Sequence, residues 1–135
     1  MPLPSVGGGY QIGDGNLNEI SLRVAATPQT ATATATLTAA QVTGGWLVAN
    51  PSTSAATYTL PTAAALDAAL ANVKTGSTFD WNVVNIGTSS GTVTLALGTG
   101  ITDGGNGLTA VATTSSALFR FYRTGDAAWS VYKVA

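Results

Sequence analysis

The sequence predicts an all-β fold, an antiparallel sandwich or barrel with one short helix and an extended N-terminal arm. Two observations favour it: short segments in which apolar and polar residues alternate, and clusters of Gly, Ser, Asn and Asp that separate these segments. Alternation with a period of two is typical of half-buried strands, and short strands at close spacing favour antiparallel two-sheet folds. At 135 residues, the chain fits one domain of ordinary size better than two.

The expected strands begin with the segment ATATATLT at residues 31–38. A strict period of two predicts a strand there despite the alanines, with one side formed by Ala31, Ala33, Ala35 and Leu37. The alternating pattern recurs in shorter segments, which we also expect to be strands: Trp46–Ala49, Thr57–Leu60, Ser77–Ile86, Thr92–Leu97, Leu108–Ala112, Ala117–Arg123 and Trp129–Val134.

One segment, at about residues 62–74, has the spacing of a helix. Its larger apolar residues Leu66, Leu70 and Val73 recur on one helical face among alanines, which are the strongest helix formers. We expect this helix to cover an open end or face of the sandwich and to stop near Gly76 as a C-terminal glycine cap. The expected core consists of six large aromatic residues on the strands: Trp46, Phe79, Trp81, Phe119, Phe121 and Trp129.

Residues 1–28 differ from the rest and are expected to form the arm, with the β domain spanning residues 29–135. Prolines and glycines break regular structure along the arm. Near its end, Ile20, Leu22 and Val24 alternate with polar residues, a short strand pattern suited to pairing with a neighbour's sheet edge. An ordinary first strand with a leader is the open alternative.

Composition limits the classes of partner. Charged residues make up 8% of the chain, far below the ~25% typical of soluble domains, and the five Lys and Arg residues are too scattered to form the basic stripe that nucleic acid requires. The apolar runs are shorter than a membrane span, and the first residues lack the features of a secretory signal. We expect no nucleic-acid or membrane partner and a protein made in the cytoplasm. Much of the apolar fraction is alanine, which makes a thin core and favours an oligomer.

Candidate catalytic residues are scarce. The chain has no histidine and no cysteine, which removes the commonest general base and the soft metal ligands. A glycosidase needs two facing carboxylates. We expect Asp67 on the exposed face of the helix, and Asp103 and Asp126 in Gly-rich turns, where an aspartate bonds to its own backbone. The sequence therefore predicts no catalysis and no cofactor.

Two further aspartate positions are candidate sites. The loop at residues 102–107 offers one carboxylate, whereas a calcium ion needs six or more oxygens, so a hairpin turn explains it better than a metal site. Asp80 is expected on the solvent side of its strand. An inward Asp80 would need a basic partner such as Arg120 or Arg123.

Several short motifs follow one another from Leu60 onward: LPTAA at 60–64, GSTF at 76–79, VNIG at 84–87, TVTL at 92–95 with GTGI at 98–101, RFYR at 120–123 and WSVY at 129–132. Their order over residues 37–135 resembles a module that recurs in tailed-phage structural proteins, in capsid decoration proteins and in the tips of head or tail fibres. The resemblance implies a jelly-roll-like β fold, trimeric association and a structural role in the virion.

On this basis we expect a capsid decoration (cement) protein, a homotrimer that binds the major capsid protein on the outer surface of a phage head and stabilises the head. The arm lies outside the resemblance, and its apolar residues need a partner surface. We expect them to contact the capsid: Leu3, Val6, Tyr10, Ile12, Leu17, Ile20, Leu22 and Val24. The alternative is a phage fibre or a receptor- or carbohydrate-binding tip, in which Tyr58, Tyr122 and Tyr132 stack on sugar rings.

Overall fold

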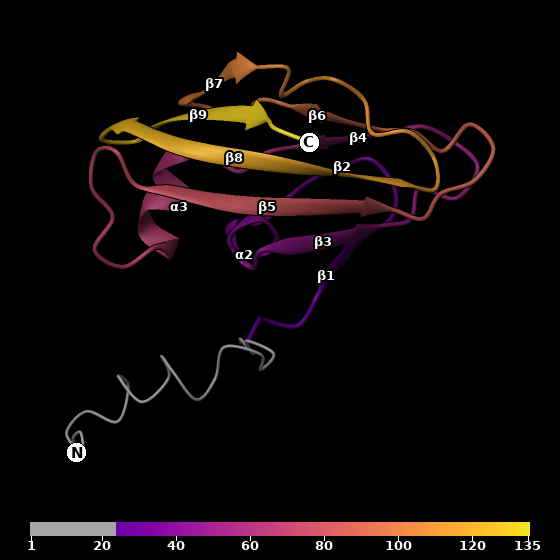
Figure 1. The fold of residues 1–135 in the computed structure, drawn as a ribbon, viewed down its shortest axis with the longest axis horizontal. Helices are drawn as coiled ribbons and strands as arrows, with labels where there is room; N and C mark the ends of the chain where they lie inside the picture. The colour runs from indigo at the N-terminus through magenta and orange to yellow at the C-terminus, as the bar shows by residue number, and fades with distance from the viewer. Residues whose placement is uncertain (1–23) are drawn as a thin grey trace, which may run out of the picture.

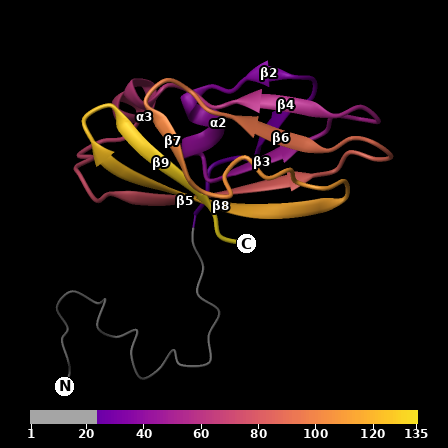
Figure 2. The same cartoon turned by 90° about the horizontal axis from the view of Figure 1, so that it is seen from above.

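The computed structural model describes residues 24–135, which form a two-layer β-sandwich (Figure 1). A large sheet has the strand order β1-β3-β5-β8-β9-β7, and a small sheet of order β2-β4-β6 lies over it (Figure 2). The expected mostly-β, sandwich-like architecture is confirmed. The strands are β1 (Gln29–Ala31), β2 (Ala35–Thr36), β3 (Trp46–Ala49), β4 (Ala56–Thr59), β5 (Thr78–Asn85), β6 (Val93–Ala96), β7 (Ile101–Gly105), β8 (Ser115–Gly125) and β9 (Ala128–Lys133), and the helices are α2 (Ala39–Thr43) and α3 (Ala63–Ala69).

The chain alternates between the two sheets from β1 to β6, so each strand in this part pairs with the strand two places later. The pairs β1–β3, β3–β5, β2–β4 and β4–β6 are all parallel, as is β7–β9. Only β5–β8 and β8–β9 are antiparallel among the described strand pairs. The expected antiparallel arrangement is therefore wrong for most pairs. Residues 24–135 give no support to a jelly-roll connectivity, which is built from antiparallel strands.

Two of the expected strands are also corrected. The segment at residues 31–38 is divided, because the chain leaves the large sheet after Ala31, bends, and enters the small sheet at Ala35. The segment at residues 108–112 contributes only an isolated bridge between Val111 and Val93. The turn expected at residues 102–107 instead begins with β7, which pairs with β9 and carries a bulge.

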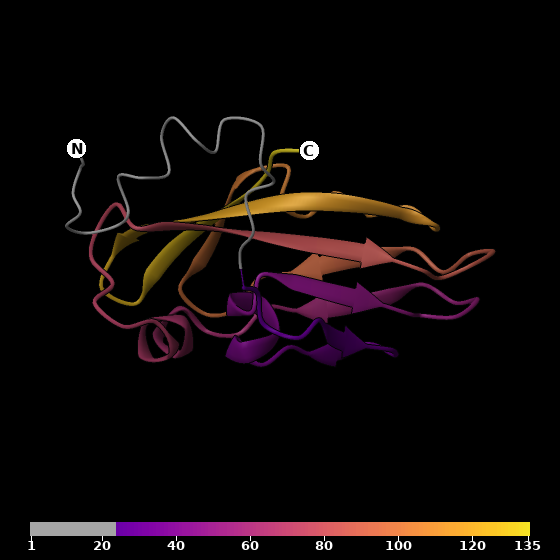
Figure 3. The same cartoon turned by 60° about the horizontal axis from the view of Figure 1, so that its bottom comes forward.

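The helices lie where the chain crosses from the small sheet back to the large one (Figure 3). α2 begins with a capping box, in which Thr38 and Gln41 each bind the other's backbone amide. α3 begins at the cap Thr62, but it ends at Ala69 with an extended Leu70, well before the expected glycine cap at Gly76. Neither helix in residues 24–135 is long and apolar enough to cross a membrane.

The core lies between the two sheets, and its aromatic residues come from β5, β8 and β9. Trp81, Phe119, Phe121 and Trp129 are fully buried, as expected, and Phe79 packs against them with partial exposure. Helix α3 contributes the buried Leu66 to the core. Leu70 and Val73, which follow the helix, are partly buried against the core. Trp46 departs from the expected core, because Leu47 and Ala49 face inward and the alternation turns Trp46 outward, where it is 38% exposed.

The segments that flank β6 run so close to those that flank its parallel neighbour β4 that glycine is required at two positions. A side chain on Gly91 would overlap the carbonyl oxygen of Ser52, and one on Gly98 would overlap that of Pro61. Beside Gly91, the buried Asn85 amide group donates hydrogen bonds of 2.9–3.1 Å to three backbone carbonyls and accepts one of 2.8 Å from Gly87. This side chain holds the β5–β6 loop together at one end of the sandwich.

We predict that Asn85→Ala destabilises the fold markedly, because it removes the partner of the Gly91 and Ala112 carbonyls and of the Gly87 amide. A loss of about 3 kcal/mol is expected, seen as a fall in melting temperature of roughly 10 °C by circular dichroism. The matched control is Asn82→Ala on the same strand, where the side chain is exposed. Equal shifts in the two variants would show that the Asn85 network is not stabilising.

Candidate functional site

The aspartates in the described part of the chain are all held by protein groups. Asp103 lies in β7 and not in a turn, but it accepts hydrogen bonds from the backbone amides of Gly105 and Gly107 at 3.0 and 2.7 Å, so its expected bonding to the local backbone is confirmed. Asp126 was expected to bond to its own backbone, but its carboxylate instead binds Arg123 at 2.9 Å. The Asp103 carboxylate is thus bound by backbone amides and that of Asp126 by an arginine.

Asp67 is the centre of a partly buried polar cluster, and the expectation that it lies on the exposed face of the helix is wrong. The Asp67 side chain points from helix α3 toward the end of β8. There the guanidinium group of Arg123 donates hydrogen bonds of 2.9 and 2.8 Å to the two carboxylate oxygens of Asp67. The indole N–H of Trp129 and the amide of Ala127 each donate a further hydrogen bond of 2.8 Å. The Asp67 side chain is only 20% exposed and that of Arg123 only 8%.

This environment fixes the charge of both groups. The hydrogen bonds from Arg123, reinforced by those from Ala127 and Trp129, hold the pKa of Asp67 well below its usual range against the opposing effect of burial. The Asp67 carboxylate in turn raises the pKa of Arg123. Since both oxygens of Asp67 are already occupied by donors, the carboxylate is suited to clamping α3 onto β8 and β9 and not to proton transfer.

A second ion pair lies on the outer face of the large sheet. Asp80 on β5 and Arg120 on β8 are directly opposite in the strand register and share two hydrogen bonds of 2.7 and 3.1 Å. The expectation that Asp80 faces solvent is confirmed, and Arg120 is its partner there. Arg120 lowers the pKa of Asp80, but both side chains are about half exposed, so water weakens the pair.

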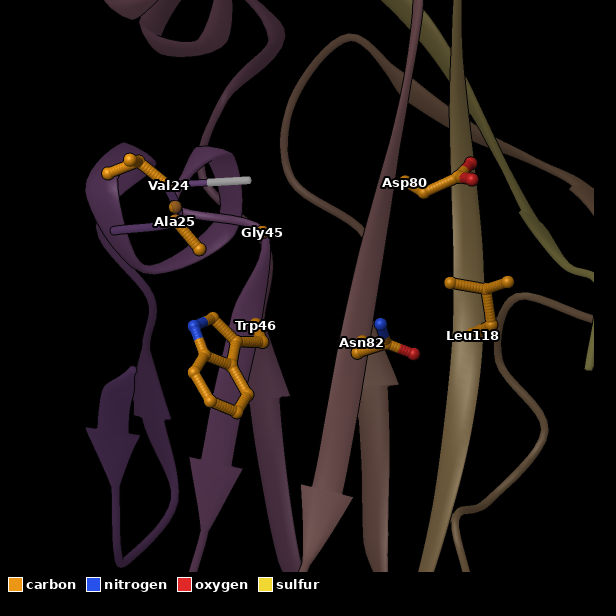
Figure 4. Close-up of a pocket in the computed structure, with 8 residues that line it drawn as sticks. Val24, Ala25, Gly45, Trp46, Asp80, Asn82 and Leu118 are labelled. Atoms are coloured by element: carbon orange, nitrogen blue, oxygen red, sulfur yellow. The ribbon is translucent and has the colours of Figure 1, made fainter. Parts of the chain in front are cut away.

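Beside this ion pair the outer face is hollowed. Trp46, Asn82 and Leu118 lie next to one another in the register of β3, β5 and β8 (Figure 4), and they line a hollow of about 800 Å³ together with Asp80. This surface differs from the expectation that Trp46 belongs to the core. The signal was present in Trp46-Leu47-Val48-Ala49, whose alternation places Trp46 and Val48 on the same face.

The chain enters the β domain at the rim of this hollow. The indole N–H of Trp46 donates a 3.0 Å hydrogen bond to the carbonyl of Ala26, and Val24 and Ala25 complete the lining. Val24 is fully exposed and is the one expected capsid-contact residue that the structure describes. The others lie outside the described residues: Leu3, Val6, Tyr10, Ile12, Leu17, Ile20 and Leu22.

The three tyrosines proposed as a sugar-stacking set do not share a surface. Tyr58 is fully buried, donates a 2.7 Å hydrogen bond to the carbonyl of Thr32, and has its pKa raised by burial. Tyr122 is 39% exposed, and Tyr132 lies on the neighbouring strand opposite Arg120. The expected set is therefore reduced to at most these two residues.

No protein-family model, curated protein or solved structure gives a significant match to the chain. Within residues 24–135, the structure contains no group of three or more acidic, histidine or cysteine side chains placed to hold a metal ion. The surface feature that stands out is the hollow on the outer face, where exposed apolar side chains meet the incoming chain.

We predict that Asp67→Asn lowers the melting temperature at neutral pH by roughly 10 °C, because it leaves a buried arginine without its main partner. The depressed pKa of Asp67 also predicts acid sensitivity: its contribution to stability is complete above the ordinary aspartate pKa of about 4 and is lost as the pH falls below that value. The difference in melting temperature between the wild type and Asp67→Asn should therefore become smaller as the pH falls below about 4.

The matched control for this prediction is Asp80→Asn, which breaks an exposed ion pair and should change the melting temperature by only about 2 °C. Thermal unfolding of the three proteins from pH 7 to pH 2 provides the measurement. A difference between wild type and Asp67→Asn that stays constant through the acid range would contradict a titrating clamp.

Proposed function

We propose that the protein is a structural virion protein that decorates the outside of a phage head, with the major capsid protein as its partner. The proposal rests on the position at which the chain enters the β domain. The hydrogen bond from Trp46 to Ala26 fixes the start of the described chain on the outer face of the large sheet. In this proposal the capsid contacts both this face and the arm, whose sequence leads into the chain at Val24.

The chemistry of the outer face supports a binding role. It carries an apolar group formed by Trp46 and Leu118, the neutral Asn82, and the internally balanced pair of Asp80 and Arg120. Such a surface gains affinity from shape and contact area instead of from net charge, since the charges on it neutralise each other. A cement protein requires this kind of contact.

The use of the acids also supports a structural role over an enzymatic one. In the described chain, Asp67, Asp103 and Asp126 are engaged by backbone or arginine donors within the fold, and Asp80 is paired across two strands. Each of these carboxylates stabilises the sandwich or its turns. We include in the proposal that the protein has no catalytic activity and needs no cofactor.

We predict that deleting residues 1–18 leaves the β domain folded but weakens or abolishes its binding to capsids that lack the protein. The deleted residues include the apolar anchors Leu3 and Val6, whose burial against the shell would contribute to affinity. Co-sedimentation with capsids measures the effect. Within the full chain, Leu3→Asp with Val6→Asp should weaken binding, and the matched control Ser5→Asp should not.

If the truncated protein decorates capsids as well as the full chain does, the arm is not needed for binding. The capsid contact must then come from the β domain. Specific glycan binding without affinity for capsids would favour a fibre or receptor-binding tip. Tyr122 and Tyr132 would then be the residues to substitute.

We also predict a homotrimer, on the basis of the alanine-rich core and the resemblance to a trimeric module. Light scattering coupled to gel filtration should give three times the chain mass of 13.4 kDa. Apolar side chains that remain exposed on the single chain, such as Ile86 and Leu97, are consistent with cover by neighbouring subunits. A stable folded monomer would contradict this prediction.

A further inference from the structure

We propose that the outer face of the small sheet is the surface through which copies of this chain associate. The inference rests on the homotrimer of the proposed function and deepens it, because it names the surface that the subunits share. Three observations support it. The small sheet is purely parallel, its outer face is uncovered in the single chain, and its strands carry no charged side chain.

The small sheet is parallel throughout, since β2 pairs with β4 and β4 pairs with β6 in parallel register. Purely parallel sheets occur almost only where both of their faces are covered. The inner face of this sheet meets that condition, because Tyr58 and Leu95 are buried in the core between the two sheets. The outer face needs a cover of its own.

Within residues 24–135, neither helix supplies this cover. α2 packs mainly against β1, β3 and β5, and α3 packs against β9, all of which belong to the large sheet. Figure 2 shows both helices beside the strands of the small sheet, toward one end of the sandwich. The side chains on the outer face are short, and each is exposed or half-buried: Thr36, Thr57, Thr59, Thr94 and Ala96.

Charge is excluded from this layer of the sandwich. Residues 24–66 and 81–102, which contain β2, β4 and β6, have no Asp, Glu, Lys or Arg, although ~25% of the residues of a typical soluble domain are charged. The charged residues of the described chain lie on α3, β5, β7, β8, β9 and their turns: Asp67, Lys74, Asp80, Asp103, Arg120, Arg123, Asp126 and Lys133. Because charged residues are depleted at the centre of protein interfaces, this distribution indicates that the small sheet is covered.

A second copy of the chain is the occupant that this chemistry favours. The face offers no charge that would attract a charged partner, and copies of it meet without like-charge repulsion. Around a three-fold axis, each copy would turn this face toward both neighbours. Leu97, which is exposed directly after β6, would gain cover there. The outer face of the large sheet, on the other side of the sandwich, stays free for the capsid (Figure 2).

Cysteine cross-linking in the full-length chain tests the interface, since the sequence contains no cysteine. Thr57→Cys places a thiol on the outer face of the small sheet, where a short bismaleimide should join two chains. The matched control is Thr78→Cys, which replaces an equally exposed threonine on β5 of the large sheet. We expect at least roughly tenfold more covalent dimer from Thr57→Cys, because association raises the effective concentration of its thiols.

A charge on the same face provides a second measurement. Thr57→Lys brings like charges together in the assembly and should reduce the mass found by light scattering from three chains to one. Thr78→Lys adds the same charge to the large sheet and should remain a trimer. Circular dichroism checks that both variants are folded. The cysteine variants add no charge, so they decide the question even if Thr57→Lys does not fold.

Equal cross-linking of the two cysteine variants would overturn the proposal, and so would a Thr57→Lys variant that stays trimeric. If that trimer instead fails to bind capsids, the face belongs to the capsid contact and not to a second copy. A wild-type monomer would remove the homotrimer and this interface together. Capsid binding is measured separately by co-sedimentation, so decoration and this interface can fail independently.

Discussion

The structure depends on one constraint, that consecutive strands from β1 to β6 are placed alternately in two sheets. Each strand then pairs in parallel with the strand two places later, and parallel pairing requires a crossover between them. The helices α2 and α3 lie in two of these crossovers. The chain segments on either side of β6 run close to those on either side of β4, so a side chain on Gly91 would overlap the backbone of Ser52, and one on Gly98 that of Pro61.

The same pairing of aspartate with arginine has two different consequences in this fold. Asp67 and Arg123 are largely shielded from water, and Asp67 accepts further hydrogen bonds from Ala127 and Trp129. The pair therefore holds helix α3 against β8 and β9. Asp80 and Arg120 have similar distances but lie half exposed on the outer face. Burial thus makes the first pair a structural clamp and leaves the second as part of a surface available to a partner.

Local patterns in the sequence were sufficient to predict the β class, the helix that follows its cap Thr62 and most of the aromatic core. They could not give strand direction, because the alternation in β3 or β6 is the same for a parallel and an antiparallel neighbour. The position of Asp67 was missed for a related reason: its partners Arg123 and Trp129 are more than fifty residues away in the chain. Helix α2 was missed although Thr38 and Gln41 have the spacing of a capping box.

The β-sandwich is held at one end by Asn85 and at the other by Asp67 with Arg123, and the chain enters it on the outer face of the large sheet. A decoration protein would cover the shell with this face and its arm, and a decorated shell needs many copies, whereas a fibre needs few. The most direct test is therefore the copy number per virion, by quantitative mass spectrometry against the major capsid protein. The account predicts copies on the order of hundreds, as expected for a protein that covers the repeating surface of a shell. A handful of copies per particle would contradict it.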